Sequence, residues 1–74
     1  MTYYGIEYHR PDGGMHYTGG SFTNILENKK RQFLEVEEII RSVGENAKDV
    51  VIKLVSLEND EYANEAKVME EIRF

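Results

Sequence analysis

One long helical period constrains this chain more than any other feature. Between Asn24 and Gly44, apolar residues recur at steps of three and four, which places them on one face of a helix and leaves the opposite face charged. This stripe consists of Phe33, Val36, Ile39, Ile40 and Val43. The pattern predicts a helix that begins at Asn24, with Glu27 completing a capping box, and ends at Gly44. A start at Asn28 is the alternative, but it would place the basic cluster, Lys29, Lys30 and Arg31, at the positive end of the helix dipole. These three cations are interpreted as a solvated helix turn, paired with Glu27 and Glu35 at four-residue spacing.

The residues before this helix predict a β-hairpin from Tyr3 to Ser21. Tyrosine and isoleucine favour strands, and a Pro-Asp-Gly-Gly run at positions 11–14 supplies turn residues. Two registers are open, with Arg10 opposite either Met15 or Gly14. The first is preferred because it separates apolar from polar residues, and a one-residue slip moves side chains to the other face. It places on one face Tyr4, Ile6, Tyr8, Met15 and Tyr17.

The preferred register also brings two histidines together. His9 and His16 would be cross-strand neighbours with Glu7 diagonal to His16, a set of ligands that can bind zinc or iron. Surface histidines need no ligand, however, and no further spacing supports a site, so no metal is predicted. The Gly19-Gly20-Ser21 run before the helix lacks the Gly-Lys-Ser/Thr signature of a phosphate-binding loop, so a bulge or bend is predicted there.

The second half of the chain predicts a strand and one ambiguous segment. Residues 49–57 are rich in β-branched side chains and predict a central strand that pairs with the hairpin. From Glu58 to Phe74 the composition favours a helix, and the alternation after Lys67 favours a strand as the alternative. The helix would bury Tyr62, Ala66, Met69 and Ile72.

The predicted fold is therefore α+β in a single domain that spans residues 1–74. A small single-layer antiparallel sheet, made of the N-terminal hairpin and a third strand, is covered by the central helix. The element order is ββαβα, with ββαββ as the alternative. A domain of this size buries only about 60 to 65% of its unfolded surface, which makes a homodimer physically reasonable.

Composition excludes several classes of function. The 74 residues include no cysteine, which excludes a disulfide or a thiolate metal site and fits the cytoplasm. No apolar run is long enough to span a membrane, and the N-terminus lacks the zones of a signal peptide, so a soluble, unprocessed protein is expected. No catalytic motif appears, so the chain is not expected to be an enzyme or to hold a cofactor.

Charge is the strongest global feature of the sequence. The chain has 14 acidic and 9 basic residues, a net charge of −5, which disfavours direct binding to nucleic acid. Carboxylates four residues apart on a helix are separated by about 6 Å, close to the spacing of phosphates on a DNA strand. An acidic helix can therefore occupy a basic channel built for nucleic acid, although acidic residues also simply keep a small protein soluble. The predicted partner contacts are Asp60, Glu61, Glu65, Glu70 and Glu71, with Glu35 and Glu38 secondary.

Tyrosines provide an alternative contact surface. Tyr3, Tyr4, Tyr8 and Tyr17 crowd the hairpin, and tyrosine gives a large contact area at low entropic cost. In this hypothesis the chain is a structural or regulatory interaction module, and the tyrosine face is its dimer or partner patch.

The short acidic chain, with its hairpin TYYGIEYHRPDGGMHYTGG, helix KKRQFLEVEEII and tail ENDEYANEAKVMEEIRF, resembles small phage-encoded proteins that shut down host machinery. In format it is most similar to inhibitors of the bacterial DNA sliding clamp, some of which act as dimers. The clamp-binding peptide pattern of a Gln followed by spaced Leu and Phe is matched only loosely by Gln32, Phe33 and Leu34. The resemblance therefore implies an inhibitor in the host cytoplasm that blocks the DNA channel of a replication or transcription protein with acidic residues.

Overall fold

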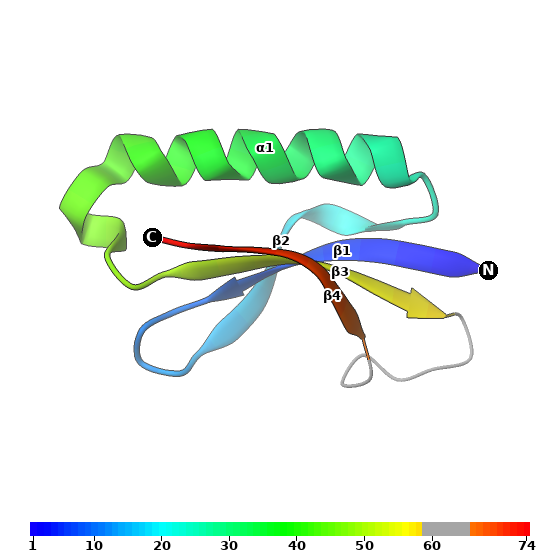
Figure 1. Ribbon diagram of the computed structural model, residues 1–74, viewed down its shortest axis with the longest axis horizontal. Coiled ribbons are helices and arrows are strands. Elements are labelled where there is room, and N and C mark those ends of the chain that lie inside the picture. Colours follow the sequence, from blue (N-terminus) through cyan, green and yellow to red (C-terminus); the bar gives the residue numbers. More distant parts are fainter. Residues whose placement is uncertain (59–65) are drawn as a thin grey trace.

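The protein is an α+β domain in which one helix lies on one face of a four-stranded antiparallel sheet (Figure 1). The structure, a computed structural model, describes residues 1–58 and 66–74. The strands are β1 (Thr2–His9), β2 (Met15–Thr23), β3 (Val51–Glu58) and β4 (Lys67–Arg73), and helix α1 (Leu26–Val43) is followed by a 3-10 turn, η1 (Gly44–Ala47). The predicted fold class, with a hairpin, a central helix and a third strand, is confirmed.

The core lies between α1 and the two central strands. The sheet order is β2-β1-β3-β4, so β1 and β3 are central, and α1 packs on β1, β2 and β3. Ile6 lies opposite Leu54, and both are fully buried beneath Phe33 and Ile40 of the helix. Each fully buried side chain of this size contributes about 1.5 to 3 kcal/mol. The face of the sheet away from α1, here called the open face, carries no helix among the described residues.

The hairpin adopts the register that was not preferred. Arg10 lies opposite Gly14, and its N–H donates to the Gly14 carbonyl oxygen at 2.8 Å. Pro11, Asp12 and Gly13 form a three-residue loop in which Gly13 has a φ of 94°, a geometry typical of a type I turn followed by a left-handed residue. The Asp12 carboxylate accepts a hydrogen bond of 2.8 Å from the Gly14 N–H. The predicted pairing of Arg10 with Met15 is wrong because these turn interactions outweigh the cleaner amphipathic pattern.

The helix begins one residue later than an N-cap at Asn24 predicts, so the predicted capping box with Glu27 is wrong. Its N-cap is Ile25, without a side-chain cap, and the Thr23 hydroxyl instead accepts a hydrogen bond of 3.2 Å from the Ile25 N–H. The predicted end is confirmed, with Gly44 at a φ of 72°. Within the stripe, Phe33 and Ile40 are buried and Val36 is partly buried, whereas Ile39 and Val43 are exposed at 64% and 48% because they lie beyond the side of the helix that meets the sheet. No helix of the described residues combines the length and apolar character that crossing a membrane requires.

The end of the chain is a strand, as in the alternative order ββαββ. β4 pairs antiparallel with β3, with Ile72 opposite Ile52 and Glu71 opposite Lys53. The preferred helix is therefore wrong for residues 67–73, and residues 59–65 of that segment lie outside the described residues. A strand satisfies the second edge of the buried strand β3, which a helix would have left without backbone partners. Phe74 continues the ladder, donating to the Val50 carbonyl oxygen at 2.8 Å.

Candidate functional site

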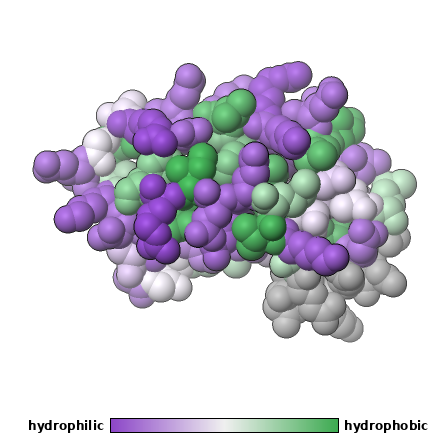
Figure 2. Space-filling view, viewed as in Figure 1, coloured by the Kyte–Doolittle hydropathy of each residue, from purple (hydrophilic) through white to green (hydrophobic). Residues whose placement is uncertain are grey.

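A groove of about 380 Å³ lies between α1 and β4, where the helix stops covering the sheet. Its lining residues, Phe33 and Leu34 from the helix and Glu70, Glu71 and Ile72 from β4, define what is here called the α1–β4 groove. Leu34 is 60% exposed although Phe33 beside it is buried. In Figure 2, hydrophobic side chains reach the surface between hydrophilic ones on the face that shows α1 and β4. The groove therefore combines an apolar floor with a charged rim.

Carboxylates lie on both α1 and β4 near this groove. Glu70 lies opposite Leu54, so its side chain is on the helix side of the sheet. Glu38 is exposed and lies one turn beyond Leu34 on the same flank of α1. Arg41 on this flank is already engaged, because its guanidinium contacts the Glu37 carboxylate at 2.8 Å and lies 5.2 Å from the centre of the Phe74 ring. Lys30, one turn before Leu34, is an exposed cation on the same flank of α1.

The predicted acidic contacts fall on different surfaces. Glu35 and Glu38 are exposed on α1, and Glu70 lines the groove. Glu71 lines the groove as well, but it also pairs across the open face with Lys53 at 3.7 Å. Asp60, Glu61 and Glu65 lie outside the described residues. The structure thus places Glu70 and Glu71 in the lining of the groove, with Glu38 one turn beyond Leu34 on α1, and it adds Leu34 and Ile72, which the sequence analysis did not select as contact residues.

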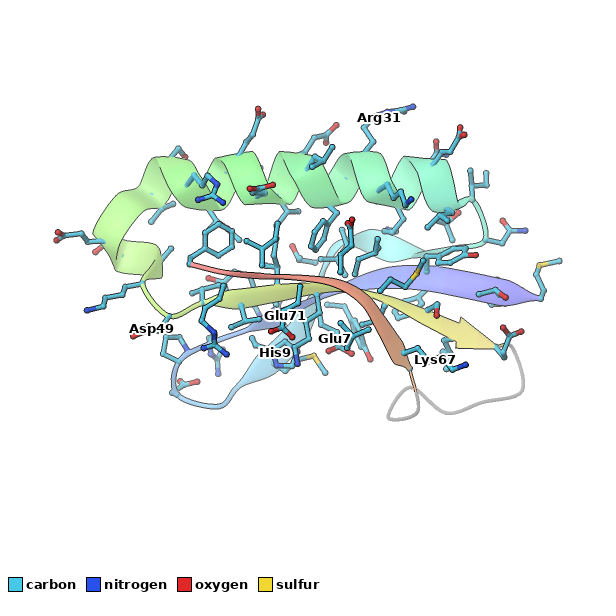
Figure 3. All side chains as sticks on the ribbon, viewed as in Figure 1. Glu7, His9, Arg31, Asp49, Lys67 and Glu71 are labelled. Carbon is cyan, nitrogen blue, oxygen red and sulfur yellow. The ribbon has the colours of Figure 1, made fainter. Side chains whose placement is uncertain are left out.

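The open face carries a row of polar side chains across all four strands. Tyr17, Glu7, Lys53 and Glu71 lie opposite one another in the order of the strands. His9 Nε2 lies 2.7 Å from the Glu7 carboxylate, and Figure 3 shows Glu7, His9 and Glu71 on the side of the sheet away from α1. Burial and the nearby Glu7 carboxylate both raise the pKa of the Tyr17 hydroxyl. These charges pair within the domain, so the row has little unpaired charge to offer a ligand.

The tyrosines do not form one patch. Because residues alternate between the faces of a strand, Tyr4 and Tyr8 of β1 lie on the helix side and Tyr3 on the open face. Tyr8 packs against the core and stacks on His16 at 4.8 Å between ring centres. Tyr17 is on the open face, where its ring meets Phe22 edge-on at 5.1 Å. The expected grouping of Tyr4, Tyr8 and Tyr17 on one face is wrong because the observed hairpin register places Tyr17 opposite Glu7, on the open face.

The prediction that His9 and His16 are cross-strand neighbours is also wrong in the observed register. His9 pairs with Met15 and His16 with Tyr8, so the two histidines lie on opposite faces of the sheet. Within the described residues, no group of three histidine, cysteine, aspartate or glutamate side chains is placed to hold a metal ion.

Lys29 is the unexpected residue of the basic cluster. The interpretation of residues 29–31 as a solvated turn fails here, because Lys29 is 1% exposed and its Nζ donates 2.9 Å hydrogen bonds to the carbonyl oxygens of Gly19 and Ser21. Burial lowers the pKa of its ammonium. The Gly19-Gly20-Ser21 run, predicted as a bulge or bend, is an interruption of the β1–β2 register with both glycines at positive φ. Its carbonyls face a cation, which is the reverse of an anion-binding loop.

Comparison with known proteins gave no match to this chain among protein families, curated sequences or solved structures.

Proposed function

We propose that this chain is a binding protein without catalytic activity that places carboxylates against a basic, nucleic-acid-binding surface of another protein. The observation that carries the proposal is the α1–β4 groove, which exposed Leu34 and the carboxylate-bearing Glu70 line, with exposed Glu38 one turn beyond Leu34 on α1. A partner that offers lysine or arginine next to an apolar side chain matches this combination. Apolar contact supplies affinity, and the charges supply orientation and fast association.

Charge placement supports a basic partner. Lys29 is buried beneath backbone carbonyls, and Arg10, Arg41 and Lys53 are paired with carboxylates of the same domain. Three of the five net negative charges come from residues 59–65, between β3 and β4 in the sequence. A basic surface would therefore meet fewer competing cations than the composition suggests, and attraction would weaken with salt as exposed charges are screened.

The resemblance to phage inhibitors makes the bacterial DNA sliding clamp the first candidate partner. Its DNA channel is a basic surface in the cytoplasm of the host cell, and a ligand in that channel prevents DNA from being loaded. The proposal assigns Glu35, Glu38 and Glu70 as the described contacts, and it includes Asp60, Glu61 and Glu65 from the sequence.

The test is binding to purified bacterial sliding clamp by biolayer interferometry, at about 50 and 300 mM salt. The proposal predicts binding that weakens at least about tenfold at the higher salt and at least about tenfold in Glu38→Lys/Glu70→Lys, since tenfold corresponds to about 1.4 kcal/mol. Glu45→Lys, an exposed charge reversal on η1, is the control for each single reversal, Glu38→Lys or Glu70→Lys, and should bind like the wild type. Salt-independent binding, or equal effects of Glu45→Lys and the groove reversals, would contradict it.

A further inference from the structure

The two edges of the sheet are not equivalent. On β2, the register is interrupted after Thr18, and Lys29 occupies two carbonyl oxygens of the interruption. On β4, an irregularity lies between the partners of Leu54 and Val55, but from Glu70 to Phe74 the strand continues in register. No described residue pairs with the outer side of this regular half. An exposed, regular strand edge is a template for another strand.

Hydrogen bonds at the end of the chain show which backbone groups point outward. Phe74 donates to the Val50 carbonyl oxygen and accepts from the Asp49 N–H, both at 2.8 Å, so its peptide groups face β3. Because these groups alternate along an antiparallel strand, those of Ile72 and Glu70 also face β3. The N–H and C=O groups of Glu71 and Arg73 therefore face the open edge.

We propose that a second copy of this chain pairs antiparallel with this edge, on a two-fold axis that passes between the two Ile72 residues. In this register Glu71 lies opposite Arg73 of the second copy, and symmetry repeats the pair. Both residues are on the open face, since Glu71 lies opposite Lys53 and Arg73 opposite Val51. The outward backbone groups of Glu71 and Arg73 then meet, which forms four hydrogen bonds and an eight-stranded sheet.

Charge selects this register over its neighbours. An axis through Glu71 or Glu70 places a glutamate directly opposite its own copy, and like charges in that position are destabilising. An axis through Met69 falls where the β3–β4 register shifts. The axis at Ile72 instead joins an isoleucine pair on the helix side with two glutamate–arginine pairs on the open face, so the edge is complementary to itself.

The pairing also joins the two α1–β4 grooves. A two-fold axis perpendicular to the sheet leaves both α1 helices on the same face, on either side of the paired β4 strands. Ile72 lines the groove of each copy, so the two grooves share a floor along the axis. Dimerisation rests on the β4 edge alone and does not depend on the proposed function.

The experiment is sedimentation velocity of the full chain from about 5 μM to 1 mM, with Glu71→Arg, Arg73→Glu and the double exchange. The wild type should sediment as a dimer of the 8.6 kDa chain at the upper concentrations. Each single variant should dissociate at least about tenfold more readily, because it places like charges opposite each other, and the double variant should return to within about threefold of the wild type. Glu35→Arg, a reversal on exposed helix surface, is the matched control and should leave the dimer unchanged.

The double variant separates pairing between copies from the contact of Glu71 with Lys53. In that variant the Glu71→Arg change still sets like charges against each other at Lys53, so only the pairing between copies is restored. Amide hydrogen exchange of the wild type gives a second test that needs no variant. Protection of the Glu71 and Arg73 amides should increase with concentration. A chain that remains monomeric at the highest concentration, or a dimer whose Glu71 and Arg73 amides exchange freely, overturns the proposal.

Discussion

The ammonium of Lys29 on α1 donates a 2.9 Å hydrogen bond to the carbonyl oxygen of Gly19 on β2, and a second one reaches Ser21. This contact ties the first turns of the helix to the interrupted part of the strand. It gives a buried cation a structural role, because a buried charge is tolerated when its hydrogen bonds are satisfied.

We expect Lys29→Met to destabilise the domain by about 1 to 3 kcal/mol, because methionine fills a similar volume but leaves two carbonyl oxygens without their donor. Chemical denaturation monitored by circular dichroism measures this change. Lys30→Met, on the exposed neighbour, is the control and should stay within about 0.5 kcal/mol of the wild type. An equal loss in both variants would show that the buried contact has no special role.

Two shifted pKa values predict opposite trends at alkaline pH. The pKa of Lys29 is lowered by burial, so the unfolded chain holds this proton more tightly, and the resulting cost to stability is relieved as pH rises toward the ordinary value of 10.5. The pKa of Tyr17 is raised by burial and by Glu7. The neutral Tyr17 hydroxyl therefore contributes to the stability of the fold below the ordinary pKa of 10.0, and this contribution is lost as pH rises through the folded-state pKa. The stability of the wild type relative to Lys29→Met should therefore increase toward pH 10. Tyr17→Phe should reduce the loss of stability that the wild type shows above pH 10. Parallel pH profiles for the three proteins would refute this assignment.

Gly5 and Phe22 provide a test of packing on the open face. A Cβ atom on Gly5 would lie 2.5 Å from Cζ of the Phe22 ring, which covers the backbone there. Gly5→Ala should cost about 1 to 3 kcal/mol through overpacking. Phe22→Leu, which shortens the side chain, should reduce that cost when the two changes are combined, and additive losses in the double-mutant cycle would argue against the contact.

The hairpin turn tests the register. Gly13 has a φ of 94°, and no atom within 4 Å would obstruct a Cβ there, so any cost of substitution comes from the backbone. Gly13→Ala should cost about 1 to 2 kcal/mol, and Gly13→Asn should cost less because asparagine tolerates positive φ better. The same denaturation measurements check both variants, and indifference to Gly13→Ala would contradict the three-residue loop.

Local sequence patterns predicted most of the elements, and the errors came from interactions that compete with those patterns or that join residues far apart in the sequence. The helix, the hairpin and β3 each follow from periodicity or β-branched content. The hairpin register failed because the Pro11-Asp12-Gly13 turn, with its Asp12 hydrogen bond, outweighed the alternation of the strands. β4 is a strand because β3 offers an unpaired edge, which composition cannot reveal.

The candidate site could be predicted only in part. Acidity marked Glu38 and Glu70, but the groove depends on where α1 stops covering the sheet. Leu34 becomes a lining residue because α1 packs on β1, β2 and β3 and leaves the β4 side of the sheet uncovered, and Ile72 because it faces α1 from that strand. Lys29 looked like one of three solvated cations, since only the folded chain brings the Gly19 and Ser21 carbonyls to it.

Loading of the bacterial sliding clamp onto primed DNA, in the presence of increasing amounts of this protein, tests the central proposal most directly. The wild type should inhibit loading at concentrations that match its affinity for the clamp. Glu38→Lys/Glu70→Lys should inhibit at least about tenfold less well, while Glu45→Lys should match the wild type. Undiminished loading at saturating wild-type protein, or equal inhibition by the groove variant, would contradict the account.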